Sequence, residues 1–353
     1  MSTDSSASPK TRKTRIGIAE VARQAGVSTA TVDRVLNHRP GVRAVTVQAV
    51  LKAAADLGYL PQDDLYRALR PQPMRLVFLL PAGTNRFLNM LGDFVRIAHE
   101  QFEPFNVQCR CRFIEGFNPQ VLVDNLLRES RRADGIAFMA LEHPLVREAV
   151  NTLTERQVHT LTLISDLSSS SRAAYVGLDN RAAGRSAGLL LGRFIGPRSG
   201  KVAMIAGSRN YRGHEEREMG FQHIIEEKFP RLEIVGLREG HDDAEINYRQ
   251  SRQLLKQYPD LVGIYNIGGA SDGVAQALKE AGRDQNTVFI GHGLTPDTRA
   301  LLVDGTLDAL INQGLHSTIM NSVRIFANLR DERDAMAGVE PMPISVVLNE
   351  NLP

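Results

Sequence analysis

The sequence is poor in cysteine and contains no long apolar run. Its two cysteines, Cys109 and Cys111, alternate in VQCRCRFI with no Cys or His partners at zinc-ligand spacing, which indicates reduced core thiols. No apolar run approaches the roughly 18 residues of a membrane span, and MSTDSSASPKTRKTR at the N-terminus lacks the apolar segment of a secretory signal. We therefore expect a cytoplasmic protein with no membrane partner, no metal and no cofactor.

Charge is distributed unevenly along the 353 residues. The net charge is +2, but residues 1–71 carry 11 Lys and Arg against 6 Asp and Glu, a net of +5, which leaves −3 on the remaining 282 residues. A basic N-terminal segment on a mildly acidic body indicates a small polyanion-binding module. A solvated charge run would give the same balance, so charge alone does not decide between them.

The spacing of apolar residues divides the chain. Residues 1–14 are rich in Ser, Thr and Lys and are expected to form a disordered arm. Over residues 15–62 apolar residues recur every three or four positions, which predicts a helical domain. The proline-bounded PQDDLYRALRPQP follows, and residues 63–73 are predicted to be a linker with about two turns of helix.

Beyond Met74, short apolar runs alternate with amphipathic helices. The predicted strands are RLVFLL, VQCRCRFI, GIAFMAL, HTLTLIS, KVAMIAG, EIVGLREG, VGIYNI, TVFIGHG and LDALINQ. Such alternation is typical of α/β proteins with parallel sheets covered on both faces. About 280 residues with nine to eleven strands predict two doubly wound lobes rather than one sheet.

The helical domain carries a helix-turn-helix pattern. A first helix from Ile18 to Ala25 ends at Gly26, a predicted left-handed turn residue, and Ser28 is placed to cap the next helix. The second helix has short polar groups and an Arg on its outer face, as DNA-reading helices do. A third helix over 44–57 completes a small core.

The motif I-x-E-V-A-R-Q-A-G-V-S-T-A-T-V-D-R-V-L-N, with A-x-L-G-Y-x-P ending at Pro61, closely resembles the headpiece of the LacI/GalR repressors. The resemblance implies base reading by Thr29, Ala30 and Arg34. It also implies phosphate contacts from Ser28, Thr31 and Asn37. Arg34 has a direct physical reason, because a guanidinium can bridge the O6 and N7 acceptors of guanine.

Asp33 departs from the family pattern, in which this position is commonly Ser. Its carboxylate could accept a hydrogen bond from a cytosine N4 amine. It could instead pair with Arg residues of the same domain and only lower non-specific affinity, which is the interpretation we favour slightly. In the linker, Tyr66 to Arg70 resembles the hinge ending of the family, which implies Leu69 as a side chain that wedges between base steps in the minor groove.

The body resembles the sugar-binding-protein-like core of the same family. The resemblance implies one lobe over about 74–178 and 313–341 and a second over about 179–312 and 342–353, closing on a ligand at the carboxyl ends of the strands. The implied ligand residues are Asn85, Phe87, Asp166, Arg217, Asn266, His292 and Gln313. Arg217 belongs to R-E-M-G-F and could instead form a salt bridge between lobes, and Asp179 and Asn180 in the crossover could be structural.

One motif suggests an enzyme. G-A-S-D-G over 269–273 fits the G-x-S-x-G nucleophile elbow, with Ser271 as nucleophile, Asp297 or Asp304 as the acid and His316 as the base. Only about 45 residues separate Ser271 from His316, and the hydrolase hypothesis does not explain the headpiece. The acidic clusters H-E-E (214–216) and H-D-D (241–243) are expected to be solvated loops rather than metal sites.

The favoured hypothesis is a homodimeric, or higher-order, DNA-binding transcriptional regulator and not an enzyme. Two headpieces related by two-fold symmetry suit a pseudopalindromic operator. A sugar, polyol or sugar acid between the lobes would change operator affinity through its preference for one lobe arrangement. The lobe arrangement that the effector prefers sets whether it releases or promotes DNA binding.

Overall fold

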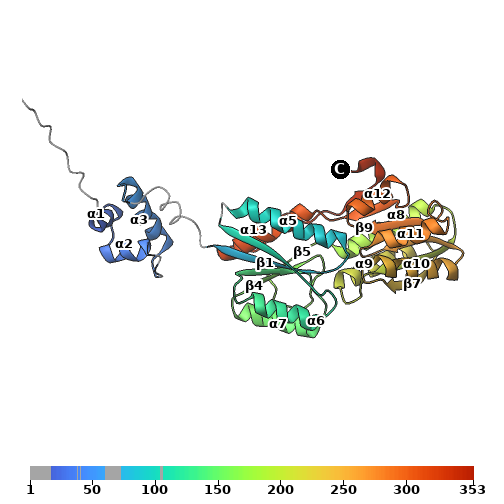
Figure 1. Ribbon diagram of the computed structural model, residues 1–353, viewed down its shortest axis with the longest axis horizontal. Coiled ribbons are helices and arrows are strands. Elements are labelled where there is room, and N and C mark those ends of the chain that lie inside the picture. The colour runs from blue at the N-terminus through green and yellow to red at the C-terminus, as the bar shows by residue number, and fades with distance from the viewer. Residues whose placement is uncertain (1–16, 38, 40, 60–72, 104–105) are drawn as a thin grey trace, which may run out of the picture. The chain divides into compact units, whose positions relative to one another are not determined.

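The structure is a computed structural model that describes residues 17–37, 39, 41–59, 73–103 and 106–353. The predicted arm (1–14) and Leu69 lie outside these residues, as does nearly all of the linker. The chain forms two compact units, Met1–Pro73 and Met74–Pro353, which are described separately (Figure 1).

The first unit contains the predicted helix-turn-helix. Its helices are α1 (Ile18–Ala25), α2 (Thr29–Leu36) and α3 (Ala44–Asp56). Gly26 adopts the predicted left-handed conformation (φ 68°) at the end of α1, and the hydroxyl of Ser28 accepts the amide of Thr31 at 3.2 Å to cap α2. The three helices bury a small core, to which α3 contributes Val50 and Leu51. Sequence spacing therefore predicted the helices, their turn and their cap.

Lobe 1 of the second unit is built on a five-stranded parallel sheet in the order β2-β1-β3-β4-β5. Helices α5 and α13 pack together on one side of this sheet, and α6 and α7 on the other (Figure 1). The strands are β1 (Met74–Pro81), β2 (Val107–Ile114), β3 (Gly135–Phe138), β4 (His159–Leu163) and β5 (Ala174–Val176). The helices are α5 (Arg86–Phe102), α6 (Pro119–Glu129), α7 (Pro144–Glu155) and α13 (Leu315–Arg330).

Lobe 2 is built on a six-stranded sheet in the order β11-β10-β9-β8-β6-β7, parallel except for the edge strand β11. The strands are β6 (Gly200–Ala206), β7 (Leu232–Glu239), β8 (Leu261–Asn266), β9 (Val288–His292), β10 (Ala309–Asn312) and β11 (Ser345–Val347). The helices are α8 (Asn180–Ile195), α9 (Arg212–Lys228), α10 (Ala244–Gln257), α11 (Ser271–Glu280) and α12 (Pro296–Val303), and a short 3-10 turn, η2 (Asn349–Asn351), follows β11.

These sheets confirm the predicted fold class of two doubly wound, largely parallel sheets. All nine apolar runs form strands, whereas β5 and β11, of three residues each, were not predicted. Cys109 is buried, Cys111 is half-buried, and both thiols are free. Burial raises the pKa of Cys109 to about 12 and that of Cys111 to about 11, so both stay protonated at neutral pH.

Helices α8 and α9 pack unusually closely through glycine. A Cβ atom on Gly184 of α8 would lie 2.0 Å from the carbonyl oxygen of Arg217 on α9. A Cβ on Gly220 would lie 2.1 Å from the carbonyl oxygen of Arg181. Both contacts are with backbone, so only glycine fits without displacing a helix. This packing fixes the backbone position of Arg217.

Candidate functional site

The outer face of α2 presents the residues predicted to contact DNA. Ser28, Thr29, Ala30, Arg34 and Asn37 are exposed, and Thr31 and Asp33 are half-buried. Within the described residues, no acidic side chain forms an ion pair with Arg34. Its side chain is exposed on the outer face of α2.

Asp33 is held inside a local network on this face. The side-chain amide of Asn37 donates to the carboxylate of Asp33 at 2.8 Å and to its carbonyl at 3.0 Å. The guanidinium of Arg39 lies 3.4 Å from the other carboxylate oxygen. Asp33 is thus paired with an Arg of its own domain, the arrangement required by the second of the two interpretations above.

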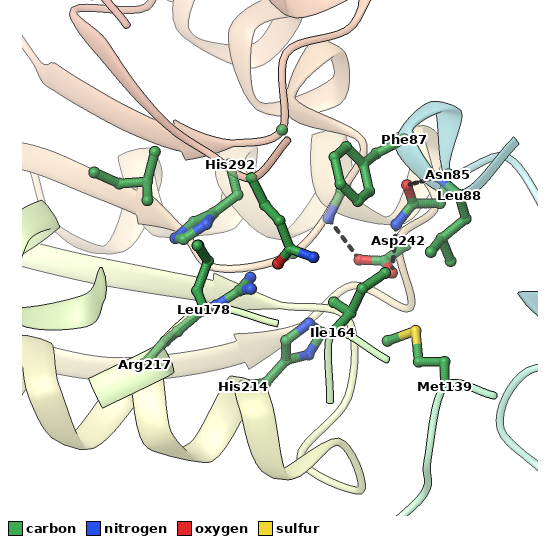
Figure 2. Close-up of a pocket in the computed structure, with 15 residues that line it drawn as sticks. Asn85, Phe87, Leu88, Met139, Ile164, Leu178, His214, Arg217, Asp242 and His292 are labelled. Atoms are coloured by element: carbon green, nitrogen blue, oxygen red, sulfur yellow. Dashed lines mark hydrogen bonds between the residues drawn. The ribbon is translucent and has the colours of Figure 1, made fainter. Parts of the chain in front are cut away.

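A cavity lies between the two lobes of the second unit, at the carboxyl ends of the strands (Figure 2). Its volume of about 50 Å³ is several times the minimum for one water molecule. The lining residues come from both lobes: Asn85, Phe87, Leu88, Met139 and Ile164 from lobe 1, His214, Arg217, Asp242, Gly268, Gly269, His292, Gly293 and Ile311 from lobe 2, and Leu178 and Gln313 from the crossovers between them.

Arg217 is a basic residue of the cavity that is held in place by burial and by two hydrogen bonds. It is only 6% exposed, its Nε donates to the side-chain oxygen of Asn180 at 2.8 Å, and one terminal nitrogen donates to the carbonyl of Ile267 at 2.9 Å. Burial lowers its pKa from the usual value. No carboxylate of the described residues forms a salt bridge with it, so the lobe–lobe salt bridge considered above is not what holds this side chain.

Two buried histidines share the cavity with Arg217. The Nδ1 atom of His214 lies 3.2 Å from the amide nitrogen and 3.0 Å from the carbonyl oxygen of Ser208, and burial lowers the pKa of this ring to about 4. The Nε2 atom of His292 lies 2.6 Å from the hydroxyl of Tyr265, and burial lowers its pKa well below the usual range. Both rings are therefore neutral at pH 7.

Asp242 joins the two lobes. It follows His241, and both residues adopt the left-handed conformation, with φ of 54° and 53°. Its carboxylate accepts the amide of Gly269 in its own lobe at 2.7 Å and the side-chain amide of Asn85 in lobe 1 at 3.0 Å. Its carbonyl accepts the hydroxyl of Thr84, also in lobe 1, at 3.0 Å. Three hydrogen bonds therefore converge on one residue at the closed edge of the cavity.

Glycines at the strand ends of lobe 2 make this closure possible. A Cβ on Gly268 would lie 2.3 Å from the carboxylate of Asp242, and one on Gly269 would lie 2.7 Å from the side chain of Asn85. A Cβ on Gly293 would lie 3.0 Å from the ring of Phe87. The lobes can approach this closely because Gly269 and Gly293 have no side chain, and Gly268 leaves room for the Asp242 carboxylate within lobe 2.

Comparison with known proteins agrees with both units. The family described as bacterial regulatory proteins, lacI family, matches residues 17–62, and the periplasmic binding protein domain matches residues 77–330. The chain belongs to the LacI family of transcriptional regulators. Its likeness to that family, first apparent in the headpiece motif, is thereby confirmed.

Individual relatives of this LacI-family chain are distant. It is 31% identical over 238 residues to an uncharacterized HTH-type transcriptional regulator of Streptomyces limosus, covering 66% of this chain and 62% of that protein. It is 28% identical over 269 residues to the HTH-type transcriptional repressor PurR of Vibrio atlanticus, covering 75% and 77%. The fold is shared with GanP, a glucose-galactose binding protein from Geobacillus stearothermophilus, at a TM-score of 0.72 and 23% identity, covering 80% of this chain and all of that one. No described helix is long and apolar enough to cross a membrane.

Five of the seven predicted effector residues line the cavity of this LacI-family chain. They are Asn85, Phe87, Arg217, His292 and Gln313. Asn85 has both ends of its amide engaged, because its oxygen caps α5 by accepting the amide of Leu88 at 3.3 Å while its nitrogen donates to Asp242. It is placed to hold the lobes together rather than to bind a ligand.

The other two predicted residues do not line the cavity. Asp166 is bound by the guanidinium of Arg172 and accepts the hydroxyl of Thr162 at 2.6 Å, which turns its charge to partners within lobe 1. Asn266 is fully buried and donates to the carbonyl of Gly269 at 2.8 Å and to the hydroxyl oxygen of Ser271 at 3.0 Å. Its role is to shape the loop after β8.

His214 and Asp242 line the cavity but were not predicted to do so. The prediction that H-E-E and H-D-D are solvated loops is wrong for these two residues, because His214 is 6% and Asp242 is 7% exposed. The only signal was position, since both segments follow strands of lobe 2 at the end where ligands bind.

The triad required by the hydrolase hypothesis is not assembled. Ser271 is buried, and its hydroxyl oxygen accepts a hydrogen bond from Asn266. Asp297 and Asp304 each form an ion pair with a basic side chain, at 3.1 and 2.6 Å. His316 is exposed, and within the described residues no hydrogen bond links a histidine to Ser271. Nothing in the structure or among the relatives supports a hydrolase.

Proposed function

We propose that this chain is a homodimeric transcriptional repressor that binds a pseudopalindromic operator and whose operator affinity is set by a small sugar-like effector in the interlobe cavity. The observation that carries the proposal is the pairing, in one LacI-family chain, of an exposed α2 face bearing Arg34 with a second unit whose interlobe cavity is lined by Arg217, His292 and Gln313. Higher oligomers are compatible with it, and no enzymatic step is part of it.

Arg34 is the side chain we expect to read a base. Replacing it with alanine should weaken operator binding by about 2 kcal/mol, roughly 30-fold, and weaken binding to random DNA much less, because a bidentate contact to guanine is lost. Fluorescence anisotropy with DNA upstream of the protein's own gene, at several salt concentrations, measures both. The control is Arg23→Ala, which removes an exposed Arg of α1 paired with Glu20.

Equal losses on operator and random DNA would show that Arg34 contacts only phosphates. Wild-type binding that is insensitive to salt, or that does not survive competitor DNA, would contradict the regulator proposal itself, because phosphate contacts make specific binding salt-dependent.

Asp33→Ser tests the carboxylate on the same face. Because Asp33 is bound to Asn37 and Arg39, we expect its removal to release both groups toward phosphate and to tighten binding to all DNA by a similar factor of several-fold. Anisotropy titrations on an operator and on variants with single base changes measure this. Asp56→Ser, an exposed site on α3, makes the same charge change away from this face. A new base preference in Asp33→Ser alone would assign base reading to the carboxylate.

The cavity supplies the means of control. Phe87 comes from lobe 1, Arg217 and His292 come from lobe 2, and Gln313 lies in the crossover between β10 and α13, so a ligand that contacts all four has its full affinity only when the lobes are closed. Such a ligand shifts the lobe equilibrium by its differential affinity for the two arrangements. Effector binding is thereby linked to the spacing of the headpieces of a dimer, and the same linkage serves an inducer or a corepressor.

A further inference from the structure

The cavity contains a buried guanidinium, that of Arg217, which forms no ion pair with the described residues. A buried guanidinium without a nearby carboxylate is costly, because neutral acceptors replace only part of its hydration. Arg217 donates to two neutral oxygens, from Asn180 and Ile267, and has no carboxylate partner among the described residues. A guanidinium has five N–H donors, so donors remain on the side that faces the cavity in Figure 2.

The carboxylates of Asp242 and Glu216 act on the charge of Arg217 from a distance, but within the described residues neither forms an ion pair with it. The carboxylate that lines the cavity, from Asp242, already accepts the amides of Gly269 and Asn85. The rings of His214 and His292 add two basic groups that are buried in the same wall. The cavity therefore presents one guanidinium with free donors, two rings able to take up protons, and one carboxylate that accepts the amides of Gly269 and Asn85.

Resting on the proposed effector role of the cavity, we propose that the ligand is a small polyhydroxy carboxylate, whose carboxylate binds the free edge of Arg217. The fork of a guanidinium matches a carboxylate with two parallel hydrogen bonds. The side-chain oxygen of Gln313 and the remaining lone pairs of Asp242 accept hydroxyl donors, and Phe87 and Ile164 contact the apolar carbons. A neutral sugar would satisfy the hydroxyl contacts but would not form an ion pair with Arg217.

The histidines give the proposal a second, independent signature. Around His214 the facing groups are Arg217, Asp242 and Glu239, with Ser208 bonded to its ring. Around His292 they are Arg217, His214 and Tyr265. Burial lowers the pKa of both rings, and the negative charge of a bound anion would raise it. Anion affinity should therefore rise as the pH falls from 8 to 6, whereas the affinity of a neutral ligand should not.

Thermal unfolding of the full-length protein with matched ligand pairs tests this proposal. The pairs are D-gluconate with D-glucitol and D-glucuronate with D-glucose, each at 10 mM in roughly physiological salt, with sodium chloride as the ionic-strength control. We expect an acid to raise the Tm by about 2 °C or more, its neutral twin to have less effect, and the difference to grow from pH 8 to pH 6. Equal or stronger stabilisation by the neutral twin, or no stabilisation by either acid, would overturn the proposal.

Variants separate the charge from the fold. Arg217→Gln should abolish the preference for acids and Arg217→Lys should retain part of it, while Arg249→Gln, an exposed α10 site, should behave as wild type. If Arg217→Gln does not fold, His214→Gln decides, because it should reduce the pH dependence of the acid effect. Neutral sugars that change operator affinity would leave the proposed function standing and sink the anion inference. Acids that stabilise a protein with no operator binding would do the reverse.

Discussion

Replacing Gly184 with alanine is expected to lower the free energy of unfolding by about 3 kcal/mol or more. The new methyl group would lie 2.0 Å from the carbonyl oxygen of Arg217, and this neighbour is helix backbone that cannot rotate away. At an open helical site the same change would stabilise the protein by up to about 1 kcal/mol, because alanine is the better helix former. Urea unfolding followed by circular dichroism measures the difference.

Gly92→Ala is the matched control on α5. Its methyl group would lie 2.5 Å from the ring of Phe113, which is 42% exposed and can turn toward solvent. We expect the free energy of unfolding of this variant to lie within about 1 kcal/mol of the wild-type value. If the two glycine variants lost equal stability, the backbone contact between α8 and α9 would not be the cause. Any folded Gly184→Ala protein should also bind effector less well, because Arg217 must move.

The same helix pair explains why Arg217 could be predicted at all. Its motif, R-E-M-G-F, contains Gly220, which α8 requires to be glycine, and Phe221, whose ring stacks on Tyr265 at 5.0 Å. The residues around the functional Arg are thus set by packing, and packing leaves a pattern in the sequence. The nine apolar strands were predictable for the same reason, whereas β5 and β11 are too short to show a period.

Residues whose roles depend on distant partners could not be predicted. Asp242 looks like one charge in a solvated loop, and only the approach of Asn85, 157 positions away, makes it a link between lobes. Asp166 follows a strand, as a ligand-binding residue of this fold would, but its carboxylate forms a salt bridge with Arg172. The local sequence does not show which side chain will pair with a given carboxylate in the folded protein.

Asp242→Ala is expected to shift the lobes toward an open arrangement. In the closed arrangement it would leave the amides of Gly269 and Asn85 without their acceptor, at a cost of about 1–3 kcal/mol each. When the lobes are open, water replaces the carboxylate at both donors. The contacts of Arg86 with Asp297 and of Tyr211 with Gly116 remain. We therefore expect the free energy of closing to become less favourable by about 2–4 kcal/mol. The ratio of closed to open protein should then fall roughly 30-fold to 1000-fold, and effector affinity should fall with it.

The chain contains no tryptophan, so a single introduced tryptophan can report this shift by its fluorescence. Phe87→Trp places one indole opposite Gly293 at the lobe interface, so opening should move its emission to longer wavelength. Asp243→Ala in the same background is the control, because that carboxylate only caps α10 by accepting the amide of Ile246 at 2.9 Å. Emission should shift for Asp242→Ala and not for Asp243→Ala. Removing an acceptor that both lobes share should favour their separation. If emission and effector affinity were unchanged in Asp242→Ala, closure would instead rest on the remaining interlobe contacts.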